Sequence, residues 1–258
     1  MLTLETFLSD MVFGFFLIFV RLGTALMIMP GLGDSFVPQN IRLFMALGLS
    51  FVMLPLTLPF VPSPVPGMNM MLSLIFMEFV IGLLIGTVAR ILMTALDTAG
   101  MIIASTSGLA NAQVFNPSMA AQGSVVGAFL SVTGVLFIFA TNLHHMLIYG
   151  LVESYQMFPI GGIPDSGSMA DLMARTVSVS FMTGLQMAIP FIVLTLMVNI
   201  LMGVLSRLMP QLQVFILVLP VQIILTLLVL SLTLSSMYLF WATQFQDGIT
   251  FFYQSAGK

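Results

Sequence analysis

The chain alternates between long apolar blocks and short polar connections. A helix needs about 20 apolar residues to cross the hydrocarbon of a bilayer, and six blocks reach or approach that length. They are Met11 to Met29, Leu43 to Phe60, Met70 to Leu96, Val125 to Tyr149, Val177 to Leu205 and Val214 to Trp241. The pattern predicts an all-α integral membrane protein with about six apolar helical blocks, organised as one domain over residues 1–258.

Glycine and proline mark the connections between the blocks. Turn-forming residues fill Pro30 to Asp34 and Pro62 to Gly67. The segment Pro159 to Met169 reads PIGGIPDSGSM, which favours water-exposed or irregular structure. Pro190 and Pro220 lie within apolar blocks, where each removes a backbone donor. We therefore expect kinked helical hairpins that pack against neighbouring proteins.

Composition excludes several classes of protein. The chain is 59% hydrophobic and only 6% charged, so lipid or other apolar protein must surround it. Its net charge is -3, and we expect no cluster of Lys and Arg that could hold nucleic acid phosphates or acidic lipid headgroups. Cysteine is absent, which removes disulfides and thiolate metal sites. We expect the protein to contact membrane lipid, to bind no nucleic acid and to carry no cofactor.

The ends and loops say little about orientation in the membrane. The first ten residues carry two carboxylates and no basic residue, whereas a cleavable signal peptide begins with a positive region. We therefore expect the first apolar block to be retained.

The basic residues do not decide the orientation of the chain in the membrane. Six alternating spans would place Arg175 and Lys258 on one side and Arg42 and Arg207 on the other.

Four charged residues interrupt or border the apolar blocks. A bare charge at mid-bilayer costs at least about 2.5 to 3.5 kcal/mol, so such side chains need partners. Arg21 and Glu78 fall at comparable depth in their blocks, which predicts an ion pair between them. Arg90 and Asp97 are seven residues apart and share one helix face. We predict that the four form a buried charge network, made of structural pairs or of a conduction path.

The segment Ser105 to Ser124, STSGLANAQVFNPSMAAQGS, joins two apolar blocks but consists mostly of small and amide side chains. Buried amides need hydrogen-bond partners, so at membrane depth this segment must line a cavity or pack on protein. A re-entrant or pore-filling loop meets that requirement. An exposed hairpin between two helices is the alternative.

Several ordered motifs carry a resemblance that covers nearly the whole chain. They are FVRLGTALMIMPGLGDSFVPQNIRLFMALGLSFVMLP (Phe19 to Pro55), EFVIGLLIG (Glu78 to Gly86), the AG and NP pairs (Ala99, Gly100, Asn116, Pro117), LHHMLI (Leu143 to Ile148) and SRLMPQLQVFILVLPVQI (Ser206 to Ile223). With these motifs the sequence resembles the FliR family, membrane proteins of the flagellar export apparatus with relatives in virulence-type type III secretion.

The resemblance implies a role without enzymatic chemistry. FliR-like proteins assemble with FliP-like and FliQ-like proteins, alongside an FlhB-like protein, into an export gate for unfolded substrates. The expected location is the bacterial inner membrane at the flagellar basal body, with much of the assembly raised above the membrane plane. An export-apparatus subunit of the virulence branch is the alternative.

The resemblance also implies that the polar loop is the plug of the channel. The residues placed in the plug are Thr106, Ser107, Gly108, Leu109, Ala110, Asn111, Ala112, Gln113, Val114, Phe115, Asn116, Pro117, Ser118, Met119 and Gln122.

Two other classes of protein fit less well. For an enzyme, His144 and His145 are the obvious candidates, but adjacent residues point about 100° apart on a helix and cannot both face one metal. The HExxH and GxSxG patterns are absent, which favours a structural or helix-end role for the histidines. A solute or ion transporter would explain charges within interrupted helices. No internal repeat between the first and last three blocks supports it.

Overall fold

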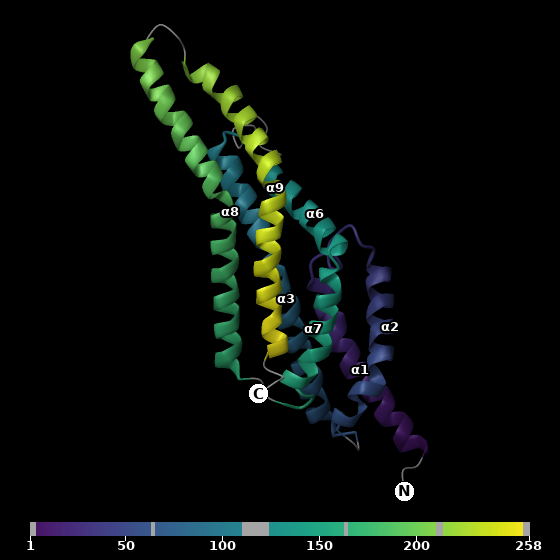
Figure 1. Cartoon of the computed structure of the whole chain (residues 1–258). Coiled ribbons are helices and arrows are strands. Elements are labelled where there is room, and N and C mark those ends of the chain that lie inside the picture. Colours follow the sequence, from purple (N-terminus) through teal and green to yellow (C-terminus); the bar gives the residue numbers. More distant parts are fainter. Residues whose placement is uncertain (1–3, 63–64, 110–123, 163–164, 210–213, 255–258) are drawn as a thin grey trace. The chain divides into compact units, whose positions relative to one another are not determined.

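A computed structural model of the chain describes residues 4–62, 65–109, 124–162, 165–209 and 214–254 (Figure 1). Every regular element in these ranges is a helix, which confirms the all-α prediction. The helices are α1 (Leu4–Ile28), α2 (Gln39–Thr57), the short 3-10 helix η1 (Leu58–Phe60), α3 (Met68–Thr106), α6 (Val125–Ala140), α7 (Leu143–Met157), α8 (Ser166–Leu208) and α9 (Val214–Gln254).

Most of these helices are long and apolar enough to cross a membrane. Five segments within the described residues qualify: Leu8–Ile28, Gln39–Phe60, Met68–Thr106, Ser166–Leu208 and Val218–Thr250. The pair α6 and α7 adds a sixth if the two are counted as one broken span. The expected set of about six apolar blocks is therefore present.

The fourth predicted block, Val125 to Tyr149, is wrong as a single helix. Helix α6 ends at Ala140, α7 begins at Leu143, and the two are bent by 76°. Asn142 lies at the break with φ 60° and ψ 17°, in the left-handed region. Asparagine adopts this conformation more readily than most residues, so it ends one helix and starts the next at low cost.

The segment Pro159 to Met169 is also less irregular than predicted, because α8 already begins at Ser166. Asp165 precedes this helix and accepts hydrogen bonds from the backbone N–H groups of Gly167 (3.3 Å) and Ser168 (3.0 Å). The hydroxyl of Ser168 donates to the same carboxylate over 2.6 Å. A carboxylate that accepts from the first helical N–H groups is a favourable helix start.

The chain divides into two compact units. Unit 1 comprises Met1–Leu92, Ile138–Thr176 and Phe245–Lys258, and unit 2 comprises Met93–Phe137 and Val177–Gln244. Helices α3, α8 and α9 each contribute residues to both units. The long helices are therefore shared between the two units.

Unit 1 contains a close approach of α1 to α3. Gly82 of α3 lies so near α1 that a Cβ atom on it would overlap the hydroxyl of Thr24 and the backbone oxygen of Arg21. Apolar residues of α1, including Leu17, Ile18 and Leu22, are almost completely buried. Small residues at such crossings allow two helix backbones to come together. The crossing also brings the middle of α1 next to the polar side chains of α3.

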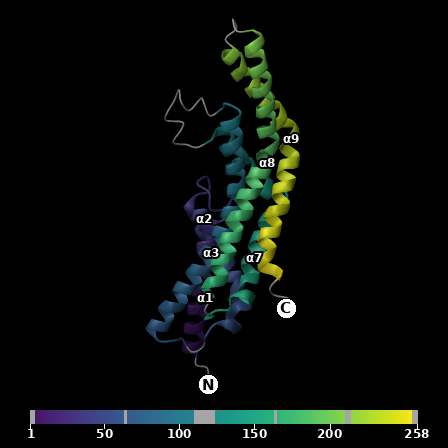
Figure 2. The ribbon, with the colours of Figure 1, turned by 90° about the vertical axis from the view of Figure 1, so that its left-hand side faces the viewer.

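Unit 2 is held by glycine contacts and aromatic packing. Gly100 of α3 and Gly127 of α6 lie so close that a Cβ on Gly100 would overlap the backbone of Gly127. Phe137 stacks on Tyr238 with ring centroids 5.5 Å apart, and the Tyr238 hydroxyl donates to the Leu130 backbone oxygen over 3.0 Å. Figures 1 and 2 show that the unit 2 parts of α8 and α9 run alongside each other.

Both predicted kink positions lie inside continuous helices. Pro190 is within α8 and Pro220 is within α9, so each helix lacks one backbone hydrogen bond at its proline. Figure 1 shows α8 changing direction along its length. That the bends are centred on these two prolines stays a prediction.

Candidate functional site: a buried ion pair and the roots of the polar loop

Arg21 of α1 and Glu78 of α3 form a buried ion pair in unit 1. The side chain of Arg21 is completely buried and that of Glu78 is 1% exposed. Two hydrogen bonds join them, Nε to Oε2 over 2.5 Å and Nη2 to Oε1 over 2.9 Å. This two-point contact is the strongest geometry for an arginine and a carboxylate. The structure therefore brings together the two charges that the sequence placed at comparable depth.

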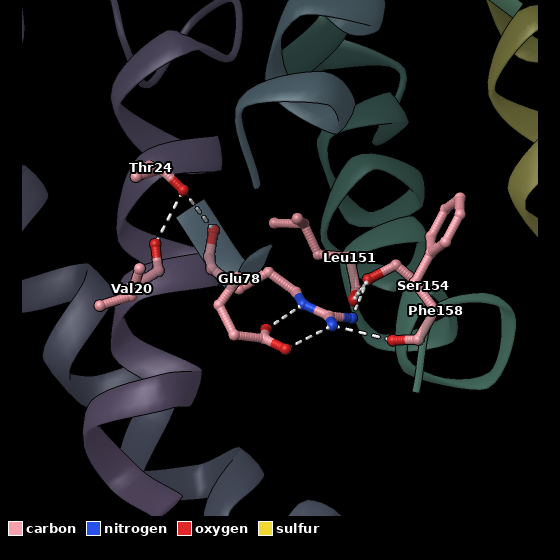
Figure 3. Close-up of polar contacts among 7 residues, drawn as sticks. Val20, Thr24, Glu78, Leu151, Ser154 and Phe158 are labelled. Atoms are coloured by element: carbon pink, nitrogen blue, oxygen red, sulfur yellow. Dashed lines mark hydrogen bonds and ion pairs between the residues drawn. The ribbon is translucent and has the colours of Figure 1, made fainter. Parts of the chain in front are cut away.

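The end of α7 completes the surroundings of Arg21. Its guanidinium donates to the Phe158 backbone oxygen over 2.8 Å. Figure 3 shows Ser154 and Phe158 of this region on the side opposite the α3 residue Glu78, with dashed lines for the hydrogen bonds among the residues drawn. A longer contact of 3.4 Å reaches the Ser154 hydroxyl, and the Tyr155 ring lies 4.0 Å from Cζ. Such contacts compensate the loss of water around a buried charge. Arg21 thus links α1, α3 and α7.

Arg90 and Asp97 depart from the predicted buried network. The Arg90 side chain is 45% exposed, and its Nη1 donates to Oδ1 of Asp34 in the turn after α1. Asp97 is exposed and accepts a hydrogen bond from the Ser131 hydroxyl of α6. The prediction that these two belong to a buried network is wrong. Helix periodicity places both residues on one face of α3, but each one bonds to the polar group that packs beside it.

The two histidines pack on each other at the start of α7. His144 and His145 lie in its first turn, with ring centroids 4.2 Å apart, and His144 also packs on Phe139 at 5.1 Å. Within the described ranges, no group of three or more His, Cys, Asp or Glu side chains could hold a metal ion. Their place in the structure is at a helix end, beside the 76° bend.

Only the first residues of the predicted plug are described. Thr106 ends α3, Ser107 is buried, and Gly108 has φ 79°, a left-handed conformation that suits glycine and ends the helix. The backbone N–H of Leu109 lies 3.4 Å from the Ser107 hydroxyl. The other predicted plug residues lie outside the described ranges: Ala110, Asn111, Ala112, Gln113, Val114, Phe115, Asn116, Pro117, Ser118, Met119 and Gln122.

A buried glutamine, which the sequence-based prediction did not include, anchors the start of the polar loop at Thr106. Gln222 of α9 is 6% exposed, and its Nε2 donates to the Thr106 backbone oxygen over 2.6 Å. The Thr195 hydroxyl of α8 donates to the same oxygen over 3.3 Å. A lone amide in an apolar helix was the available sequence signal, because a buried amide requires a partner.

The end of the polar loop, at Ser124, is also anchored on α3. The Ser124 hydroxyl donates to the Gly100 backbone oxygen of α3 over 3.0 Å and accepts from the Gly127 backbone N–H over 3.2 Å. Ser124 therefore caps the start of α6 while binding α3. Both ends of the polar segment are anchored on the last two turns of α3.

Comparison with known proteins places the chain in one family. The family described as bacterial export proteins, family 1, matches residues 12–248. The flagellar biosynthetic protein FliR of Caulobacter vibrioides is 38% identical over 239 residues, covering 92% of this chain and 94% of that protein. The FliR protein of Aquifex aeolicus is 30% identical over 245 residues, covering 95% and 93%. The Yop proteins translocation protein T of Yersinia pestis is 29% identical over 154 residues, covering 59% of each. The chain therefore belongs to the FliR family of bacterial export proteins.

Proposed function

We propose that this protein is a membrane subunit of the flagellar type III export gate. In this proposal it forms, with FliP-like and FliQ-like proteins and beside an FlhB-like protein, the channel through which unfolded flagellar proteins leave the cytoplasm. The observation that carries the proposal is the match to flagellar FliR proteins along nearly the whole chain. The expected place is the flagellar basal body in the inner membrane, and the role requires no catalysis.

The surface of unit 2 supports a role inside an assembly. Large apolar side chains on α8 and α9 are exposed in the isolated chain, among them Phe181, Leu201 and Leu232. Only 17% of the most apolar window of each helix is buried. Apolar surface of this extent must be covered by lipid or by other proteins. Neighbouring gate subunits would supply part of that cover.

The polar segment from Thr106 to Gln122 is proposed as the plug of this channel. This proposal is supported by the hydrogen bonds that anchor the two ends of the segment, at Thr106 and at Ser124, and by its content of small and amide residues. Deleting residues 106–122 should raise ion leakage or permit unregulated export through the assembled gate. Unchanged membrane conductance in an assembled complex would count against the plug.

The virulence branch of type III secretion is the second candidate. The similarity to the Yersinia pestis translocation protein favours it, but that match covers 59% of the chain, against 92% for the Caulobacter vibrioides FliR protein. A deletion strain separates the two branches. The flagellar assignment predicts cells that neither swim nor secrete flagellar proteins, with both restored by the intact gene. Normal swimming without the gene contradicts it.

A further inference from the structure

A polar hollow lies in unit 1 at the turn between α1 and α2. Its volume is about 650 Å³, and its lining includes Asp34, Gln39, Arg42 and Arg90. Arg42 lies in the first turn of α2 and Arg90 lies on α3, so 48 residues separate them in the sequence (90 − 42). No run of basic residues marks this site in the sequence. The fold brings two of the six Lys and Arg residues of the chain to one hollow.

The hydrogen bonds leave this hollow with an excess of positive charge. Arg42 donates Nε and Nη2 to the Val37 backbone oxygen (3.0 and 2.7 Å) and Nη2 to the Asp34 backbone oxygen (2.6 Å). The carboxylate of Asp34 accepts at Oδ1 from Nη1 of Arg90 and at Oδ2 from the backbone N–H of Gly31, the latter over 2.8 Å. The lining of the hollow therefore contains two guanidinium groups and one carboxylate, and both oxygens of that carboxylate are already engaged.

Donor groups remain for a ligand. Among the described contacts, Nη1 of Arg42 and both Nε and Nη2 of Arg90 have no acceptor. Arg42 is held in place by the backbone of the turn, whereas Arg90 is 45% exposed. A guanidinium fork suits the oxygens of a phosphate group, because it donates two parallel hydrogen bonds.

The position of the hollow along the helices points to the source of the phosphate. From Met68 to Arg90, α3 rises about 33 Å at 1.5 Å per residue, which is close to the thickness of a bilayer hydrocarbon core, about 30 Å. The candidate span of α1, Leu8–Ile28, ends just before the turn. If these helices cross the membrane, the hollow lies at the depth of lipid phosphates.

Exposed apolar residues stand beside the hollow. Phe36 in the turn is 59% exposed, and Ile41 and Phe44 on the first turns of α2 are 50% and 70% exposed. A cationic hollow next to apolar side chains matches a molecule with an anionic head and hydrocarbon tails. We propose that the hollow binds the headgroup phosphate of an anionic phospholipid, with Arg42 and Arg90 as its donors. This proposal departs from the sequence-based expectation that no cluster of Lys and Arg could hold an acidic lipid headgroup.

The test is lipid binding by the purified full chain in mild detergent, titrated with short-chain phosphatidylglycerol or phosphatidylcholine. Arg90→Gln should weaken phosphatidylglycerol binding about tenfold, the effect expected for losing one charge-assisted contact. Arg42→Gln together with Arg90→Gln should remove the preference for phosphatidylglycerol over phosphatidylcholine. Arg175→Gln, which changes an exposed arginine that does not line the hollow, should leave binding within about twofold of the unaltered chain.

Arg42 also binds the backbone of the turn, so its variant is judged only if its helical circular dichroism matches that of the unaltered chain. If the circular dichroism of the Arg42 variant differs from that of the unaltered chain, the outcome is decided by Arg90→Gln alone. Equal phosphatidylglycerol binding by Arg90→Gln and Arg175→Gln overturns the proposal. Inorganic phosphate is titrated in parallel. If it binds with the same arginine dependence while phosphatidylglycerol shows no preference over phosphatidylcholine, the ligand is a free anion and the lipid assignment is wrong.

Discussion

The side-chain amide of Gln222 donates to the backbone oxygen of Thr106 over 2.6 Å and so joins α9 to the last residue of α3. The final carbonyl groups of a helix have no partner within the helix itself. Here the partner comes from a buried side chain of another helix, with the Thr195 hydroxyl of α8 as a second donor. The position at which the polar loop begins therefore depends on two other helices of unit 2.

Replacing Gln222 with methionine should loosen this anchor. Gln222→Met keeps the length of the side chain but removes the shorter of the two hydrogen bonds to the Thr106 oxygen, so that only the 3.3 Å contact from the Thr195 hydroxyl remains. The loss of one such hydrogen bond costs about 0.5–1.5 kcal/mol. If the loop is the plug, the assembled gate should conduct ions more readily. Ser231→Ala on the exposed face of α9 is the control and should not change conductance. A Gln222→Met gate as tight as the control gate would show that the anchor does not hold the closed state.

The ion pair of Arg21 and Glu78 should behave as one coupled unit. Either Arg21→Met or Glu78→Leu leaves a buried charge without its partner, which costs about 3–5 kcal/mol. The double variant removes both charges and should be more stable than either single variant. Unfolding in detergent measures these differences, with Arg175→Met as an exposed control. Single effects that simply add in the double variant would mean that the two side chains are not coupled.

Gly100 should tolerate no side chain. A Cβ at this position would overlap the backbone of Gly127, which cannot move as a flexible side chain can. Gly100→Ala should therefore push α3 and α6 apart and cost about 1–3 kcal/mol or more. Gly48→Ala is the matched control, because no atom lies within 4 Å of a Cβ at that position. Thermal unfolding of the two variants compares them, and equal losses would contradict the close packing of these helices.

Asp165 should make the start of α8 sensitive to acid. Hydrogen bonds from the Ser168 hydroxyl and then from the N–H groups of Ser168 and Gly167 lower the pKa of Asp165 below its usual 3.8. A lowered pKa stabilises the folded state above pH 3.8, and this contribution is lost as the pH falls through the lower folded value. Hydrogen exchange at the first turn of α8 should therefore quicken in that acid range.

Replacing Asp165 with asparagine separates the effect of the carboxylate charge from the effect of capping the start of α8. Asp165→Asn keeps an acceptor for the helix N–H groups, so the start of α8 should persist but lose this acid dependence. Asp165→Ala should speed exchange at every pH. The control is Asp171→Asn, which changes an exposed carboxylate further along α8. An acid response that survives in Asp165→Asn would assign it to another group.

The sequence predicted the features that follow from hydropathy and from the cost of burying charge. The helical blocks are visible because apolar runs are long, and the contact of Arg21 with Glu78 follows because each charge needs a partner at its own depth. The break at Asn142 was missed, because a single residue in the left-handed region leaves the surrounding apolar pattern unchanged.

Other contacts between residues far apart in the sequence were not predicted. Asp97 shares a helix face with Arg90, but Arg90 bonds to Asp34 because the turn after α1 packs beside it. Gln222 and Thr195 become anchors of the loop only once α8 and α9 lie next to the end of α3. One sequence reveals which side chains need partners, whereas the tertiary packing of the helices selects the partners.

Co-purification tests the proposal of an export-gate subunit most directly. The chain, carrying an affinity tag and expressed at its native level, is isolated from inner membranes and analysed for bound proteins, and the isolated particle is then imaged. We predict that FliP-like and FliQ-like proteins accompany it in one particle with a central channel. Recovery of the folded chain from flagellated cells without either protein would contradict the account.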